Sequence, residues 1–159
     1  MKYSASTRGR HTPRGPFRLQ IGKSTIHRRG VFATESVPAN RKVIEYTGKI
    51  LNRNQAKAKR DADHLYLFSL DERDYWFVDG SDGGSGAEFV NHSCDPNLRA
   101  VVRGRRVFYF SKRKIRKGEE LTVDYNLDSQ CEQRVPCHCG SRNCRGTINK
   151  QKPEAKRSR

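Results

Sequence analysis

Long apolar runs are absent from this sequence, and hydrophobic residues make up only 33% of its 159 positions. No segment approaches the ~20 consecutive apolar residues that a helix needs to cross a bilayer. The N-terminus also lacks the apolar core of a secretory signal. We therefore expect a soluble, intracellular protein. Its first 34 residues are rich in Arg and Ser/Thr and lack acids, which is also compatible with import into mitochondria or plastids.

Acidic residues are scarce, since 17 Asp and Glu oppose 33 Lys and Arg and the net charge is +16. None occurs before Glu35, and none lies between Arg99 and Lys117, a stretch with nine Lys or Arg. By contrast, nine of the 17 lie between Asp61 and Asp95. The basic stretches are either a solvated surface or an attraction for DNA, RNA or nucleoprotein, and the acidic middle could receive a basic peptide.

The length suits one domain and is too short for two. Residues 1–16 and 150–159 are basic, polar and punctuated by Pro or Gly, so we expect two tails with little fixed structure. Most segments between them read as short strands, which predicts a mostly β protein. The exceptions are a helix at 52–63 and a loop or short helix start at 81–88. The expected strand pairs lie at 17–25 with 27–33, 42–51 around Gly48, 64–70 with 75–80, and 98–115 around Gly104.

Cysteine is infrequent but clustered, because three of the five cysteines stand in CHCGSRNC, as Cys137, Cys139 and Cys144. In a reducing compartment this spacing indicates metal binding rather than a disulfide framework. Zinc prefers four tetrahedral ligands, so one is missing from this segment. The candidates are Cys94, Cys131 and His138, of which His138 would point away from a metal held by both of its neighbours. Cys94 would bring in a ligand from the body of the protein and staple the C-terminal segment to it.

Four segments in order, HRRGVFA, EFVNHSCDPN, GEELTVDYN and CHCGSRNCRGTI, together resemble a SET domain followed by its post-SET zinc segment. The resemblance covers a SET domain at 17–130 and a post-SET segment at 131–149. It implies a mostly β fold of short strands in which the NHSC and DY segments pass through a knot-like crossing. It also implies a protein lysine methyltransferase that uses S-adenosylmethionine and holds a structural Zn²⁺. The cofactor would sit on one face, and the target lysine would enter from the other.

Residue roles follow from the resemblance one position at a time. Tyr125 matches the catalytic tyrosine, and Tyr46 matches an aromatic residue that lines the lysine channel. The four zinc ligands become Cys94, Cys137, Cys139 and Cys144. The positions assigned to cofactor binding are Arg28, Arg29, Gly30, Val31, Phe32, Tyr66, Asn91, His92, Tyr125 and Ile148.

Three positions depart from the family pattern. Arg28 stands where the first Gly of a G-x-G turn is usual, which matters if the backbone there needs a positive φ. Glu88 replaces a usual Arg before NHSC, and Val123 replaces an aromatic residue that often limits the number of methyl groups. Nearby, we expect Glu119 and Glu120 to cap or solvate their turn.

Rival interpretations remain open at this point. A cysteine hydrolase built on His92 and Cys94 is disfavoured, because Cys94 is better explained as a metal ligand. A zinc-stapled basic module could instead bind nucleic acid without catalysis, with Phe108 to Phe110 as a stacking surface, although their alternation equally fits a core strand. For the enzyme we expect a monomer, a lysine-bearing histone or other basic DNA-associated protein as substrate, and nucleic-acid contact through the tails. We expect it in the cytoplasm if the source is bacterial and on chromatin in the nucleus if it is eukaryotic.

Overall fold

The protein is described by a computed structural model that covers residues 12–60, 66–71, 73–127 and 134–150. Cys131 and most of the two expected tails lie outside these residues. Within them, no helix is long and apolar enough to cross a membrane. The elements are β1 (Leu19–Lys23), β2 (Arg29–Ala33), β3 (Lys42–Tyr46), β4 (Lys49–Asn52), α1 (Arg53–Arg60), β5 (Leu67–Ser69), β6 (Trp76–Asp79), η1 (Ala87–Phe89), β7 (Asn91–His92), β8 (Leu98–Arg103), β9 (Arg106–Ser111) and β10 (Glu120–Val123).

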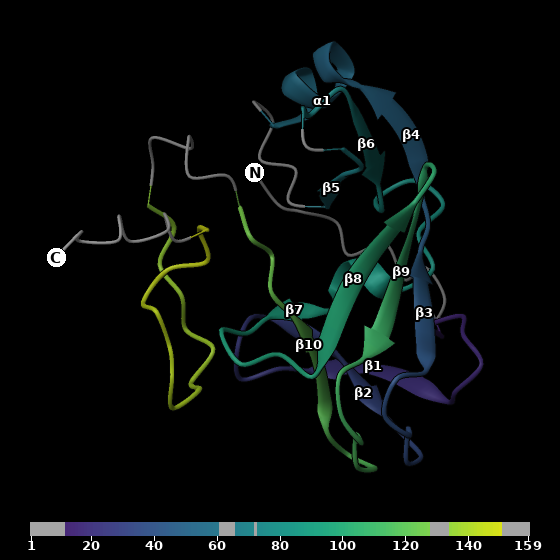
Figure 1. The fold of residues 1–159 in the computed structure, drawn as a ribbon, viewed down its shortest axis with the longest axis vertical. Helices are drawn as coiled ribbons and strands as arrows, with labels where there is room; N and C mark the ends of the chain where they lie inside the picture. The colour runs from purple at the N-terminus through teal and green to yellow at the C-terminus, as the bar shows by residue number, and fades with distance from the viewer. Residues whose placement is uncertain (1–11, 61–65, 72, 128–133, 151–159) are drawn as a thin grey trace, which may run out of the picture.

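Three small sheets form the fold, with strand orders β1-β2-β10-β7, β3-β9-β8 and β4-β6-β5 (Figure 1). The first two share one hydrophobic core, into which β9 directs every second side chain, while β3 contributes the consecutive Val43 and Ile44 where its register with β9 shifts. Val31, Ile44, Tyr109 and Leu121 are among the fully buried residues of this core. Burial of a large apolar side chain contributes roughly 1.5–3 kcal/mol, so the alternation in the sequence is enough to fix which face of each strand points inward.

The expected hairpins are confirmed, since β1 pairs with β2, β5 with β6 and β8 with β9, all antiparallel. Segment 42–51 also forms two strands, but the expectation that they pair with each other is wrong. β3 pairs with β9, while β4 pairs with β6 in another sheet. The reason lies at Gly48, where a Cβ would stand 2.1 Å from the Asp79 carbonyl oxygen. The backbone passes so close to β6 there that it crosses into the third sheet instead of turning back.

Helix α1 begins with a reciprocal cap. The backbone N–H of Gln55 donates to Asn52 Oδ1 at 3.0 Å, and the Asn52 N–H donates to Gln55 Oε1 at 2.9 Å. The helix then packs Ala56 against Leu51 and Phe77 in a second, smaller cluster. The part of the expected helix beyond Arg60 lies outside the described residues.

Strands β7 and β10 place two distant motifs side by side. They pair in parallel, with Thr122 opposite Asn91 and Val123 opposite His92. The two segments that the family resemblance expects to cross are therefore neighbours in space. The C-terminal segment joins them through a bridge between Leu127 and Asn149, and the Lys150 N–H donates to the Leu127 carbonyl at 2.7 Å.

Candidate functional site

Asn91 is buried, and its side-chain amide lies within hydrogen-bonding distance of several groups of the loop before β2. Its side-chain amide nitrogen lies 2.9 Å from the Arg29 carbonyl and 3.4 Å from that of His27. The same nitrogen lies 3.1 Å from Ser24 Oγ and 2.8 Å from Glu120 Oε1. One amide carries two hydrogens and cannot serve four acceptors equally. The cluster is therefore rich in acceptors and suits an additional cationic donor such as an ammonium group.

Glu120 is the residue of this cluster that the sequence left unrecognised. Its carboxylate accepts from the Ser24 hydroxyl at 2.8 Å, and it lies so close to Gly30 that a Cβ there would stand 2.1 Å from Oε1. The expectation that Glu120 merely caps its turn is therefore wrong. For Glu119 the same expectation is confirmed, because it accepts from the Arg116 N–H at 2.9 Å and pairs with Arg113. A side chain at position 30 would displace the Glu120 carboxylate from this cluster, and nothing in the sequence near Glu120 indicates this contact.

Arg28 occupies the left-handed region with φ +38°, on the turn where the Ser24 N–H donates to the Arg28 carbonyl at 3.2 Å. The backbone thus keeps the conformation that glycine would adopt freely, and the arginine bears a cost of about 1 kcal/mol. The departure from the G-x-G pattern therefore leaves the geometry of the turn intact. Arg28 itself is exposed to solvent.

Aromatic rings continue the site beyond this turn. The Arg29 guanidinium lies 4.2 Å above the centre of the Phe89 ring, and that ring meets Tyr66 edge to face at 5.8 Å. Phe89 was not among the expected site residues, although it directly follows Glu88 in the EFVNHSC motif. Glu88 itself accepts from the Gly86 N–H at 2.8 Å, so it caps η1 where the family usually has an arginine.

Three other residues that were expected to bind the cofactor, Val31, Phe32 and Ile148, lie in different surroundings. Val31 is fully buried in the core opposite Leu121, and the Phe32 ring packs against Gly22 on β1. Both residues pair with β1 on one side and β10 on the other, and the Val31 side chain is buried in the core, so neither presents a free group to the Asn91 cluster. Ile148 stands beside β10, where its carbonyl accepts from the Leu127 N–H at 3.4 Å.

Tyr125 follows β10, and both its hydroxyl and its backbone N–H are hydrogen-bonded to the segment 90–92, which contains β7. Its hydroxyl donates to the Val90 carbonyl at 2.8 Å, and its backbone N–H donates to His92 Nδ1 at 3.1 Å. Burial of His92 lowers its pKa, so the ring is neutral and its proton lies on Nε2, 3.4 Å from Cys94 Sγ. Although 40% of Tyr125 is exposed, partial burial and then the neighbouring Tyr66 and Glu120 raise its pKa. Tyr125 is therefore a neutral phenol near pH 7 and not a phenolate base.

Tyr46 and Tyr109 line the interior next to this tyrosine. The Tyr46 hydroxyl donates to the Tyr66 carbonyl at 2.8 Å, and the Tyr46 and Tyr109 rings meet edge to face at 6.2 Å. Burial raises the pKa of both hydroxyls well above the ordinary value, with smaller contributions from Tyr125 and Glu88. Both stay neutral near pH 7, so they add no negative charge that would stabilise a nearby ammonium.

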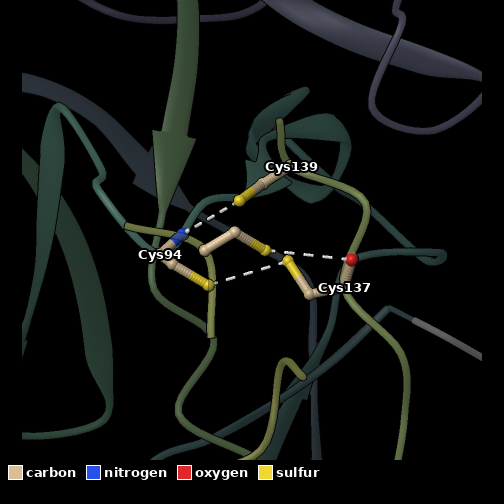
Figure 2. A group of neighbouring side chains, drawn as sticks. Cys94, Cys137 and Cys139 are labelled. Carbon is tan, nitrogen blue, oxygen red and sulfur yellow. Dashed lines mark hydrogen bonds between the residues drawn. The ribbon is translucent and has the colours of Figure 1, made fainter. Parts of the chain in front are cut away.

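Four cysteines form a compact cluster, with all sulfur atoms within 4.8 Å of one another (Figure 2). Cys94 comes from the turn after β7, and Cys137, Cys139 and Cys144 come from the C-terminal segment. Cys94 Sγ and Cys137 Sγ lie 3.7 Å apart, close to the ~3.8 Å expected for two sulfurs of a tetrahedral Zn–S₄ site. Of the three candidates for the fourth ligand, the structure brings in Cys94, while His138 is exposed outside the group. A metal held by this group would leave no free cysteine nucleophile at Cys94.

Backbone donors surround the sulfur atoms. The Cys94 N–H donates to Cys139 Sγ at 3.5 Å, the Arg145 N–H to Cys94 Sγ at 3.3 Å and the Gly146 N–H to Cys144 Sγ at 3.4 Å. Burial raises the pKa of Cys137 to about 12, whereas at Cys139 the hydrogen bonds from Cys94 and Ser141 outweigh burial and lower the pKa to about 5. The protein environment thus favours the thiolate at Cys139, whereas burial disfavours it at Cys137 and Cys94, so a metal would have to displace protons from these two sulfurs.

A second connection joins the C-terminal segment to the body. The Arg145 guanidinium makes two hydrogen bonds to the Asp124 carboxylate, at 2.6 and 2.8 Å. The two side chains are only 20% and 21% exposed. Burial alone would raise the pKa of Asp124, but the bonds from Arg145 and the Asn126 N–H outweigh it and hold the pKa below its ordinary value. We call this pair the Asp124–Arg145 latch, and it lies between Tyr125 and the cysteine cluster.

Comparison with known proteins identifies the family. The SET-domain model matches residues 28–126, which is more than half of the chain. The chain therefore belongs to the SET-domain family, and the mostly β architecture with a C-terminal cysteine cluster agrees with that assignment.

Its relatives are histone-lysine methyltransferases. The chain is 38% identical over 141 residues to the H3 lysine-4 specific histone-lysine N-methyltransferase of Schizosaccharomyces pombe, covering 82% of this chain and 15% of that protein. It is 37% identical over 142 residues to SETD1B of Homo sapiens, covering 83% and 7%. It also resembles the crystal structure of KRYPTONITE in complex with mCHG DNA and SAH, with a TM-score of 0.70, 32% identity, and coverage of 85% and 30%. The chain thus spans less than a fifth of the length of these two curated relatives.

Proposed function

We propose that this chain transfers a methyl group from S-adenosylmethionine to the side-chain amine of a lysine in a histone or other basic DNA-associated protein. One observation carries the proposal. The Asn91 cluster and Tyr125 are joined through β7, since His92 follows Asn91 directly and binds the Tyr125 N–H at 3.1 Å. The residues proposed to bind the cofactor and the residue expected to orient the amine are therefore connected through adjacent residues of one strand and a direct hydrogen bond.

The Asn91 cluster fits the methionine end of the cofactor. Carbonyls of His27 and Arg29 converge with the Glu120 carboxylate on one amide, and this acceptor-rich group matches an α-ammonium. The adenine end would lie toward Ile148 and the backbone of His92. The bound cofactor supplies the methyl group, and the chain supplies its orientation. The similar KRYPTONITE structure is a complex with SAH, which supports this choice of cofactor.

The tyrosines suit an amine nucleophile. Free lysine has a pKa of about 10.4, so it must lose a proton before it can attack a methyl group. A channel walled by the neutral rings of Tyr46 and Tyr125 disfavours the ammonium form and lowers that pKa. Proton loss to solvent then suffices, and Tyr125 acts by aligning the amine through its hydroxyl. The raised pKa of Tyr125 supports a positioning role over that of a general base.

The cysteine cluster fits Zn²⁺ in a structural role. Four sulfur ligands complete a tetrahedron and leave no open position for substrate. Cys94, Cys137, Cys139 and Cys144 would hold the ion, which would fix the C-terminal segment against the turn that follows Asn91 and His92. Domain boundaries at 17–130 and 131–149 are consistent with this arrangement.

The experiment incubates the protein with labelled S-adenosylmethionine, core histones and reconstituted nucleosomes. We expect label on lysine, and we expect Tyr125→Phe to reduce turnover by at least about tenfold while cofactor affinity changes little, because one positioning contact to the reacting amine is lost. Tyr75→Phe is the matched control, since Tyr75 is 51% exposed and stacks beneath Arg53 on the third sheet. Full activity in Tyr125→Phe, or cofactor binding with no transfer to any histone, would contradict the proposal.

A further inference from the structure

The sheet β3-β9-β8 has an outer face on which aromatic rings alternate with cations. Figure 1 shows β9 between β8 and β3. On β9, Val107 and Tyr109 are buried, while Phe108 and Phe110 are half-buried on the opposite side of the strand. Paired residues share a face of a sheet, so their partners on the neighbouring strands lie beside them. The outer face consists of Lys42, Glu45, Arg99, Val101, Arg103, Arg106, Phe108 and Phe110.

Cations lie over both phenylalanine rings of the outer face. The Arg99 guanidinium lies 5.2 Å from the centre of the Phe110 ring, and that of Arg106 lies 5.0 Å from the Phe108 ring. The Lys42 ammonium approaches Phe108 at 5.4 Å from another strand. At the tip of the β8–β9 hairpin, Arg105 lies 4.0 Å above the Trp76 ring. These contacts hold long basic side chains close to a flat surface, which reduces the entropy lost when a ligand binds them.

Positive charge predominates on this face. Its single acid, Glu45, is neutralised by Arg106 through two hydrogen bonds of 2.7 Å, and the bonds from Arg106 lower the pKa of Glu45. Lys42, Arg99 and Arg103 remain as exposed cations. The face continues past β9 into the exposed segment 112–114, which is Lys-Arg-Lys. With its one acid paired to Arg106, this predominantly basic surface is complementary to a polyanion.

We propose that the outer face binds single-stranded nucleic acid, with bases stacked on the rings and guanidinium groups and phosphates paired with the surrounding cations. Two features favour a single strand over a duplex. Phe108 and Phe110 lie on the central strand about 7 Å apart by the rise of a β-strand, so two successive unstacked bases can each meet one ring. Among the described residues, the single α-helix packs against β4 and β6 and not on this face, so the face offers no helix to enter a duplex groove. The proposal does not depend on methyl transfer.

The first test measures binding of a fluorescent 12-nucleotide single strand, as DNA and as RNA, and of the matching duplex over a range of salt concentrations. We expect tighter binding of the single strand than of the duplex. The pair Phe108→Leu and Phe110→Leu keeps every charge, and it should weaken single-strand binding by at least about tenfold through lost stacking. Phe108→Tyr with Phe110→Tyr keeps the rings and should restore binding.

The second test separates specific phosphate contacts from the overall charge. Arg99→Gln with Arg103→Gln should lower the slope of log affinity against log salt by about 1.4, because each phosphate contact on a single strand contributes about 0.7. Lys49→Gln with Lys57→Gln removes the same charge from exposed positions on β4 and α1, and should change the slope much less. An unchanged circular dichroism spectrum and melting temperature check that each variant is folded. Equal or tighter binding of duplex, equal losses in both charge pairs, or unchanged binding in the leucine pair would each overturn the proposal.

Discussion

The Asp124–Arg145 latch gives a quantitative prediction about metal binding. Three of the four proposed zinc ligands lie in the C-terminal segment and the fourth, Cys94, lies in the body, so binding of the ion at this cluster would require the segment to be docked. Asp124→Asn keeps the shape of the side chain and its bond to the Asn126 N–H but removes the charge that faces Arg145. Docking should therefore weaken without loss of the fold.

The magnitude follows from the geometry of the latch. Fully buried ion pairs cost about 3–5 kcal/mol when one partner is removed, and exposed pairs less than about 1 kcal/mol. At 20% and 21% exposure, with two short charged hydrogen bonds, we expect about 1.5 kcal/mol. Because docking and metal binding are linked, this corresponds to roughly tenfold weaker zinc binding.

The assay is competition for Zn²⁺ with a chromogenic chelator at neutral pH. Glu119→Gln is the matched control, because it removes one charge from the Arg113–Glu119 ion pair, which does not touch the C-terminal segment. We expect the control to stay within about twofold of the unaltered protein, as usual for a more exposed pair. Equal zinc affinity of Asp124→Asn and the unaltered protein, with both folded by circular dichroism, would refute the latch as a docking contact.

Three further predictions concern the turn, the cofactor cluster and acid stability. Arg28→Gly should leave the free energy of unfolding within about 1 kcal/mol, because relief of the left-handed strain offsets the entropy of glycine, whereas Arg28→Val should lose more in a denaturant titration. Glu120→Gln should weaken S-adenosylmethionine binding at least about fivefold by calorimetry, since one charged hydrogen bond is lost, and an unchanged affinity would exclude Glu120 from the site. At Asp79, burial alone would raise the pKa, but bonds from Lys59 and Ser81 outweigh it and lower it, so its stabilisation is present above about pH 4 and is lost as the pH falls through the folded value. Asp79→Asn should therefore flatten the acid side of a melting-temperature profile.

Local patterns predicted the hairpins and the cysteine site, because the signals lie within a few residues of each other. Alternation marked β9, and Gly104 marked its turn at φ +62°. The spacing of CHCGSRNC marked three ligands of the metal cluster. What the sequence did not reveal depends on contacts between distant segments. The separation of β3 from β4 follows from the approach of Gly48 to Asp79, and nothing near Gly48 encodes that neighbour.

The candidate site shows the same division. Asn91 and Tyr125 could be proposed from the sequence because their motifs are contiguous, while the contacts of Glu120 and Phe89 could not be foreseen because their partners come from other segments. Glu120 reaches Ser24, and Phe89 lies beneath Arg29. Of the acids in the acidic middle, Asp71 accepts backbone N–H groups of its own turn and Asp79 is buried against Lys59, so neither of these two is free to meet a basic peptide. Composition alone does not distinguish acids that face solvent from those used to close a turn.

The order of strands in the first sheet has a consequence for synthesis of the chain. β2 is synthesised before β10, yet one of its two edges pairs only with β10, for example Val31 with Leu121. Until β10 has left the ribosome, that edge is an open template for another strand. The sheet cannot be completed from the N-terminus onward, and its non-local pairing should make its closure slow. A chain that ends before Val123 would therefore expose an unpaired strand edge. We expect such a truncated chain to aggregate unless a chaperone binds it, instead of folding on its own.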